Sequence, residues 1–212
     1  MSKSIILILI IIFLSFILGL AFYSQMPIKM ASHWNASGAV DGYMPKFWGL
    51  FLMPIISVVM FLLFIFIPKI DPLKQNIQDF KKYYENFILI LIAFLFYLYV
   101  LTLIWNLNVR FNFILFLIPA FALIFYYAGV LISRAKRNWF IGIRTPWTLS
   151  NDVVWDKTHR LSAKLFKASA ILSLLGIAFP KYAIWFVLVP ILLASIYSVV
   201  YSYLEYQKQT KK

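Results

Sequence analysis

Apolar residues run through this chain in long uninterrupted blocks, which short polar segments separate. A membrane-spanning helix needs about 20 consecutive and mostly apolar residues. The blocks therefore predict six spanning helices, at residues 5–23, 47–67, 87–105, 113–132, 161–179 and 184–203. We expect the first helix to be retained, because it is long for a signal peptide and no small-residue cleavage site follows it.

The fifth predicted helix differs from the others because Lys164 and Lys167 interrupt its first turns. Long lysine side chains near the end of a span can extend to the lipid headgroups. Upstream of these lysines, an apolar or neutral face with helical spacing includes residues 154, 155, 158, 161, 162, 165 and 166. Ser150 or Asn151 suits the N-cap of this helix. We therefore expect an interfacial amphipathic helix that leads into the fifth span.

Composition supports the same class of protein. The chain is 63% hydrophobic and 13% charged, whereas soluble domains have about 45–50% apolar and about 25% charged residues. The predicted fold class is an all-α integral membrane protein. The chain has no cysteine, which excludes disulfides, thiolate catalysis and cysteine-bound metals.

The positive charges predict the orientation of the helices. Six spans place sixteen of the twenty Lys and Arg residues on one side, which includes both termini. Because cytoplasmic loops carry the excess of Lys and Arg, we expect both termini in the cytoplasm of a cell-membrane protein. The bilayer accounts for the net charge of +13, and direct nucleic-acid binding is not expected.

The predicted spans hold no Asp, Glu, His, Lys or Arg away from their ends. Ion-coupled transporters usually need such groups within the membrane, so this class is disfavoured. Any acid–base chemistry is confined to two long loops, one in each of two predicted regions. Residues 1–67 form a helical hairpin with an outer loop, and residues 68–212 form a four-helix region with a cytoplasmic loop.

The outer loop, residues 24–46, is rich in turn-forming residues, with Asn35, Gly38 and Gly42 among them. It also contains His33 and Asp41, which could both bind a metal. Zinc sites normally need three or four protein ligands, and the loop offers no convincing third. A turn-rich loop is the simplest interpretation, contact with a ligand or peptide is the second, and we expect no metal and no cofactor.

The cytoplasmic loop contains the residue types of a hydrolase triad, namely Ser150, Asp152, Asp156 and His159. On a helix, a serine and a histidine nine residues apart lie more than two turns from each other. No catalytic residue is therefore assigned, and we expect no enzymatic activity. A basic surface that contacts a partner or the bilayer is favoured over catalysis, and a solvated linker remains the simplest alternative.

Both loops resemble the SdpI family of membrane immunity proteins against a bacterial peptide toxin. The segment IGIRTPWTLSNDVVWDKTHRLSAKLF, residues 141–166 and here the signature segment, is similar to the family motif at Arg144, Thr145, Pro146, Trp147, Thr148, Asn151, Trp155, Lys157, Thr158, His159 and Arg160. The segment MPIKMASHWNASGAVDGYMPK is similar to the domain of unknown function that precedes this motif, at Pro27, His33, Trp34, Asn35, Gly38, Asp41, Gly42 and Lys46.

The resemblance implies immunity against an extracellular peptide toxin, together with recruitment of a cytoplasmic transcriptional repressor to the membrane. His33, Trp34, Asn35, Gly38, Asp41 and Gly42 would then form the sensing loop, and the motif residues of the signature segment would dock the partner. The alternative is a membrane enzyme, or a protein that handles lipid or peptide, acting at the cytoplasmic interface through His159.

Overall fold

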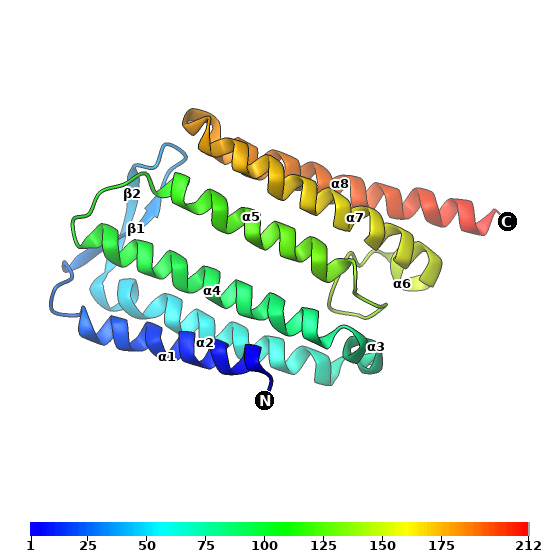
Figure 1. Ribbon diagram of the computed structural model, residues 1–212, viewed down its shortest axis with the longest axis horizontal. Helices are drawn as coiled ribbons and strands as arrows, with labels where there is room; N and C mark the ends of the chain where they lie inside the picture. The colour runs from blue at the N-terminus through cyan, green and yellow to red at the C-terminus, as the bar shows by residue number, and fades with distance from the viewer. Residues whose placement is uncertain (212) are drawn as a thin grey trace.

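The computed structural model describes residues 1–211 and is predominantly helical, as predicted (Figure 1). The element order is α1 (Lys3–Ala21), β1 (Lys29–Trp34), β2 (Val40–Pro45), α2 (Lys46–Ile70), α3 (Lys74–Asp79), α4 (Lys81–Asn106), α5 (Phe113–Ile132), α6 (Pro146–Ser150), α7 (Asp152–Ser173), η1 (Leu174–Ile177), η2 (Pro180–Tyr182) and α8 (Ala183–Thr210).

The long helices run antiparallel and form one elongated bundle (Figure 1). The β-strands and the turn between α7 and α8 lie at one end, here the hairpin end. The chain termini, α3 and α6 lie at the opposite end, here the signature end. The two loops that resemble the family motifs are therefore separated by the whole length of the bundle.

Five segments are long and apolar enough to cross a membrane, namely α1, α2, α4, α5 and Pro180–Thr210. They leave many large apolar side chains exposed, with Phe13 of α1 69% accessible and Ile196 of α8 61% accessible. Such surfaces suit contact with lipid rather than with water. The coarse prediction of a helical membrane protein is confirmed.

The segment predicted as an interfacial helix followed by a fifth span is one continuous helix, α7. It begins after the N-cap Asn151, whose side-chain oxygen accepts hydrogen bonds from the N–H groups of Val153 (2.8 Å) and Val154 (3.1 Å). The N-cap prediction is confirmed at Asn151. Because α7 carries six charged residues, it is not among the five apolar segments.

The interpretation of residues 24–46 as a loop was incomplete, because β1 and β2 form an antiparallel hairpin there. The predicted turn is present at its tip. Each strand has six residues, and the register shifts between Ala31 and Trp34. This irregular pairing disturbs the alternation that would have identified a strand.

The apolar core has separate clusters rather than one centre. The largest joins α1, α2, α3 and α4 and extends to Leu131, Ala135, Ile141 and Trp155 of the later part of the chain. In α4, it includes Tyr84, Ile88 and Ile92. Packing therefore groups α4 with α1 and α2, whereas the division at residue 67 remains a prediction from sequence.

Candidate functional sites at the two ends of the bundle

The tip of the hairpin is a turn organised by Asn35. Its side-chain oxygen accepts hydrogen bonds from the N–H groups of Ser37 and Ala39, both at 3.0 Å. Gly38 has a φ of +80°, a backbone conformation that glycine adopts without steric cost. Asn35 and Gly38 therefore shape the turn, and exposed neighbours such as Ala36 form its outer surface.

His33 of β1 is paired with Gly42 of β2, and its side chain forms a hydrogen-bonded pair with the side chain of the adjacent Asp41. The imidazole is 70% exposed and the carboxylate 44% exposed. Because both side chains are exposed, they are available for contact with another molecule. An exposed pair of this kind contributes little to stability. Within residues 1–211, no three His, Cys, Asp or Glu residues gather in a metal-binding arrangement.

The hairpin is fastened to the helices by polar and aromatic contacts. Asn106 at the end of α4 accepts a hydrogen bond from Ala31 N–H (2.8 Å) and donates one to the Ala31 carbonyl (3.1 Å). Trp34 stacks on Phe113 of α5, with ring centroids 3.8 Å apart, and meets Trp105 edge to face at 5.7 Å. Trp34 is thus a structural anchor that bridges α4 and α5.

At the signature end, His159 is buried, with 2% of its surface exposed. Its Nδ1–H donates to the carbonyl of Trp155 (2.8 Å), and its Nε2 accepts from the N–H of Ile143 (3.0 Å). The ring also stacks on Trp155, with centroids 3.9 Å apart. Both contacts require the neutral Nδ1–H tautomer, and burial lowers the pKa of His159 from 6.5 to about 4.

Gly142 allows the loop to approach this imidazole. It has a φ of +119°, and a Cβ atom at this position would lie 2.3 Å from His159 Nε2. Any larger residue would therefore clash with the ring and push Ile143 away from it. The glycine and the histidine, seventeen residues apart, form one structural unit.

Thr145 and Thr148 of the signature segment form a capping box at the start of α6. Thr145 Oγ1 accepts from the N–H of Thr148 (3.2 Å), and Thr148 Oγ1 accepts from the N–H of Thr145 (2.9 Å). Thr148 Oγ1 also donates to the carbonyl of Ile143 (2.7 Å). Thr145 Oγ1 reaches Ser202 Oγ of α8 at 3.0 Å, so the box ties the loop to the last helix.

Residues before the signature segment complete this network, and the sequence interpretation did not identify them. Asp71, at the end of α2, accepts from the N–H of Trp139 (2.9 Å). Asn138 is fully buried and bonds the backbone of Ile141 through both its side-chain nitrogen (2.9 Å) and its oxygen (2.6 Å). The indole of Trp155 donates to the Ala135 carbonyl (2.8 Å).

The structure divides the predicted docking residues into three groups by burial. The buried members stabilise the loop, and they are Thr145, Thr148, Trp155, Thr158 and His159. Trp147 and Asn151 are half-buried, and the exposed members are Arg144, Pro146, Lys157 and Arg160. Only the exposed group can contact a partner without rearrangement of the loop.

The hydrolase hypothesis placed Ser150, Asp152, Asp156 and His159 in one site, but the side chains do not converge. Ser150 Oγ donates to the carbonyl of Trp147 (3.2 Å), and Asp152 lies 2.8 Å from Arg137 Nε. Both nitrogens of His159 already bond the backbone. As it is folded here, the imidazole has no free nitrogen to take a proton from a serine.

An exposed surface at this end includes Trp139, which is 51% accessible. Arg144 Nη1 donates to the Trp139 carbonyl (2.8 Å), which holds the guanidinium against the backbone of Trp139. Pro146 is exposed nearby in sequence. Trp and Arg are enriched at protein interfaces, and we call Trp139, Arg144 and Pro146 the inner surface.

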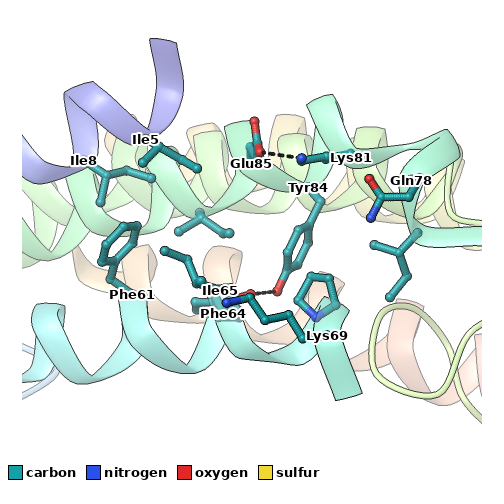
Figure 2. A pocket seen from close by; sticks show the side chains of 13 residues that line it. Ile5, Ile8, Phe61, Phe64, Ile65, Lys69, Gln78, Lys81, Tyr84 and Glu85 are labelled. Carbon is teal, nitrogen blue, oxygen red and sulfur yellow. Dashed lines mark hydrogen bonds and ion pairs between the residues drawn. The ribbon is translucent and has the colours of Figure 1, made fainter. Parts of the chain in front are cut away.

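An apolar pocket of about 260 Å³ lies between α1, α2, α3 and α4 near the signature end (Figure 2). Its walls include Ile5, Ile8 and Phe61, and at its edge Lys81 lies 3.9 Å from Glu85. The Tyr84 hydroxyl donates to the Phe64 carbonyl (2.8 Å). These walls suit apolar groups and hold no constellation for acid–base chemistry.

Comparison with known proteins gives a family for both ends. The model of the SdpI/YfhL protein family matches residues 134–202, and the model of a domain of unknown function, DUF1648, matches residues 10–58. The chain is thus similar to the SdpI/YfhL family at the signature end and to DUF1648 at the hairpin end. The resemblance inferred from the two loops is confirmed, and it agrees with a multi-pass membrane protein.

The chain is similar to the immunity protein SdpI of Bacillus subtilis (strain 168). The two are 29% identical over 209 residues, which cover 98% of each chain. The similarity therefore includes both ends of the bundle. No solved structure matches the chain.

Proposed function

We propose that this chain is an immunity and signalling protein of the plasma membrane, with no enzymatic activity, that protects a cell against an extracellular peptide toxin. The observation that carries the proposal is the position of two distinct loops at opposite ends of one bundle (Figure 1). The full-length similarity to a protein named for immunity supports the same role. The exposed His33–Asp41 pair would contact the toxin, and the inner surface would hold a cytoplasmic transcriptional repressor.

In this proposal the bundle crosses the membrane six times, with residues 161–179 as the fifth crossing and both termini in the cytoplasm. α7 runs antiparallel to α5 and α8 and packs between them (Figure 1). This position supports counting it as a crossing in addition to the five apolar segments. With six crossings, the sequence assigns sixteen of the twenty Lys and Arg residues to the side of both termini, which supports a cytoplasmic location for that side. The start of α7 would then lie at the membrane interface.

Orientation can be tested with single cysteines, because the natural chain has none. Ala36→Cys at the exposed hairpin tip should react with a membrane-impermeant thiol reagent in intact cells, and Ser150→Cys should react only after lysis. Both positions are exposed, so unequal access would not come from burial in the protein. Labelling of Ser150→Cys in intact cells would reject the proposed orientation.

Function can be tested by expressing the chain in toxin-sensitive cells and challenging them with membrane-active peptide toxins. The paired variant His33→Gln with Asp41→Asn should lower survival while leaving the amount of protein in the membrane unchanged. Lys29→Gln, which removes a charge from another position in the same hairpin, is the matched control. Unchanged survival of cells with and without the natural chain would reject the immunity role.

The signalling arm has a separate readout, the membrane localisation of fluorescently tagged transcriptional repressors expressed together with the chain. Trp139→Ala with Arg144→Gln should release the repressor and preserve toxin resistance. Val153→Ala removes another exposed apolar side chain near the same loop and should leave the repressor at the membrane. Retention in all variants would reject the inner surface as the docking site.

A further inference from the structure

A groove of about 370 Å³ lies between the end of α5 and the first half of α7. Five cationic side chains line it: Arg134, Lys136, Arg160, Lys164 and Lys167. Asp156 is its one acidic lining residue. From this concentration of charge we propose that the groove binds the phosphate group of an anionic phospholipid of the cytoplasmic leaflet.

The charges in the groove are not neutralised within the protein. Among residues 1–211, the ion pairs within 4.0 Å involve other cations, such as Arg137 and Lys157. Like charges gathered in one hollow repel each other, and a bound anion relieves that repulsion. His159 forms part of the wall as a neutral ring, because both of its nitrogens bond the backbone.

A simpler explanation is that basic residues gather here because cytoplasmic ends of membrane proteins are basic. This rule explains Arg134 and Lys136, which follow α5 directly, where cations also complement the helix dipole. It does not explain why Arg160, Lys164 and Lys167 line the same hollow from α7. Their spacing of four and three residues places them on one helical face.

The depth of the groove favours a lipid over a soluble anion or an acidic protein segment. Lys167 extends along α5, with its Nζ 5.7 Å from the centre of the Tyr126 ring. A Cβ atom on Gly129 would lie 2.9 Å from Lys167 Cγ, so the two helices approach closely there. Tyr126 precedes the end of α5 by six residues, which is about 9 Å along a helix. A lipid phosphate can reach this depth from the headgroup layer.

The proposal can be tested with the full chain purified in a neutral detergent. Thermal unfolding is followed while phosphatidylglycerol or phosphatidylcholine is added, and lipids retained by the protein are identified by native mass spectrometry. We expect phosphatidylglycerol alone to raise the unfolding temperature and to stay bound. Added salt should weaken the effect, because it screens exposed charges.

The deciding variant combines Arg160→Gln, Lys164→Gln and Lys167→Gln. Because this variant removes three of the five cations that would attract the phosphate, about tenfold or more phosphatidylglycerol should be needed for the same shift. The matched control combines Lys74→Gln, Lys82→Gln and Lys208→Gln, which removes three exposed charges from the same end. It should bind lipid like the natural chain.

Equal losses in the two triple variants, or equal effects of the two lipids, would overturn the proposal. Inorganic phosphate tested at matched ionic strength separates the lipid from a free anion, and full protection by phosphate alone would also overturn it. If the groove variant does not fold, Lys164→Gln alone is measured by lipid retention, because this side chain is exposed. The test is independent of the immunity role, since it uses no toxin and no repressor.

Discussion

The two histidines of the chain show how differently its two ends are built. His33 is exposed on the hairpin and pairs with a carboxylate, whereas His159 is buried and pairs with two backbone groups. Both belong to segments that carry a family motif. A motif histidine can therefore serve contact with other molecules at one end and the shape of a loop at the other.

The first prediction compares the two glycines with positive φ. Gly142→Ala should destabilise the protein by about 4 kcal/mol, because it combines an unfavourable backbone angle with a clash against His159 and the loss of a buried hydrogen bond. Gly38→Ala should cost about 2 kcal/mol, because its positive φ disfavours alanine and the Cβ would meet Asn112 Oδ1, the N-cap acceptor of α5. Denaturation in detergent measures both, and equal losses would contradict the contrast between the ends.

The second prediction compares the histidines directly. His159→Ala should cost about 3 kcal/mol, since it leaves the Ile143 N–H and the Trp155 carbonyl without partners and removes a stacked ring. His33→Ala should change stability by less than about 0.5 kcal/mol. Loss of toxin resistance in His33→Ala at normal stability would support a contact role for His33 and a structural role for His159. Similar destabilisation by both variants would contradict this difference between the two histidines.

The third prediction concerns pH. The pKa of His159 is about 4 in the folded protein and 6.5 when exposed, so between these values the unfolded chain binds a proton that the folded chain excludes. Stability from this group is therefore complete above pH 6.5 and falls as the pH drops to about 4, by about 3 kcal/mol in total. The comparison of natural chain and His159→Gln between pH 4 and 7.5 should show a smaller decline in the variant.

The fourth and smallest prediction concerns the attachment of the hairpin. Asn106→Ala removes both hydrogen bonds to Ala31 and should cost about 1.5 kcal/mol. Hydrogen exchange should become faster in β1 and remain unchanged in residues 141–159. Faster exchange at both ends would show that the ends are energetically coupled, which the proposed signalling requires at some level.

The helices were predictable because length and hydropathy define a membrane span with few alternatives. Residues 113–132 were predicted with the observed bounds of α5, and the predicted N-cap at Asn151 was found. The hairpin was not predicted, because its six-residue strands pair with a shifted register. Lys29–Trp34 has no regular alternation of apolar and polar residues.

The signature end was predicted as a surface, and half of it is interior. One available signal was the position of His159 four residues after Trp155, on the helical face that also holds Ser162. Ile143 and Gly142, which contact the ring of His159, lie sixteen and seventeen positions upstream, in a loop that only tertiary folding brings over α7. Asp71 was missed for the same reason, since its bond to Trp139 spans 68 positions. The bonds of Asn138 are local, and it was missed because the sequence did not show that this loop is buried.

The polar character of α7 has a consequence for biogenesis. By itself, a helix with six charged residues would partition poorly from the translocon into the lipid bilayer, whereas α8 is strongly apolar. The two helices match through Ser162 Oγ, which donates to Ser198 Oγ at 2.7 Å, and through the Lys157–Glu205 pair. Synthesis of α8 would therefore precede stable insertion of α7, and a chain released from the ribosome before α8 should leave α7 accessible to cytoplasmic proteases.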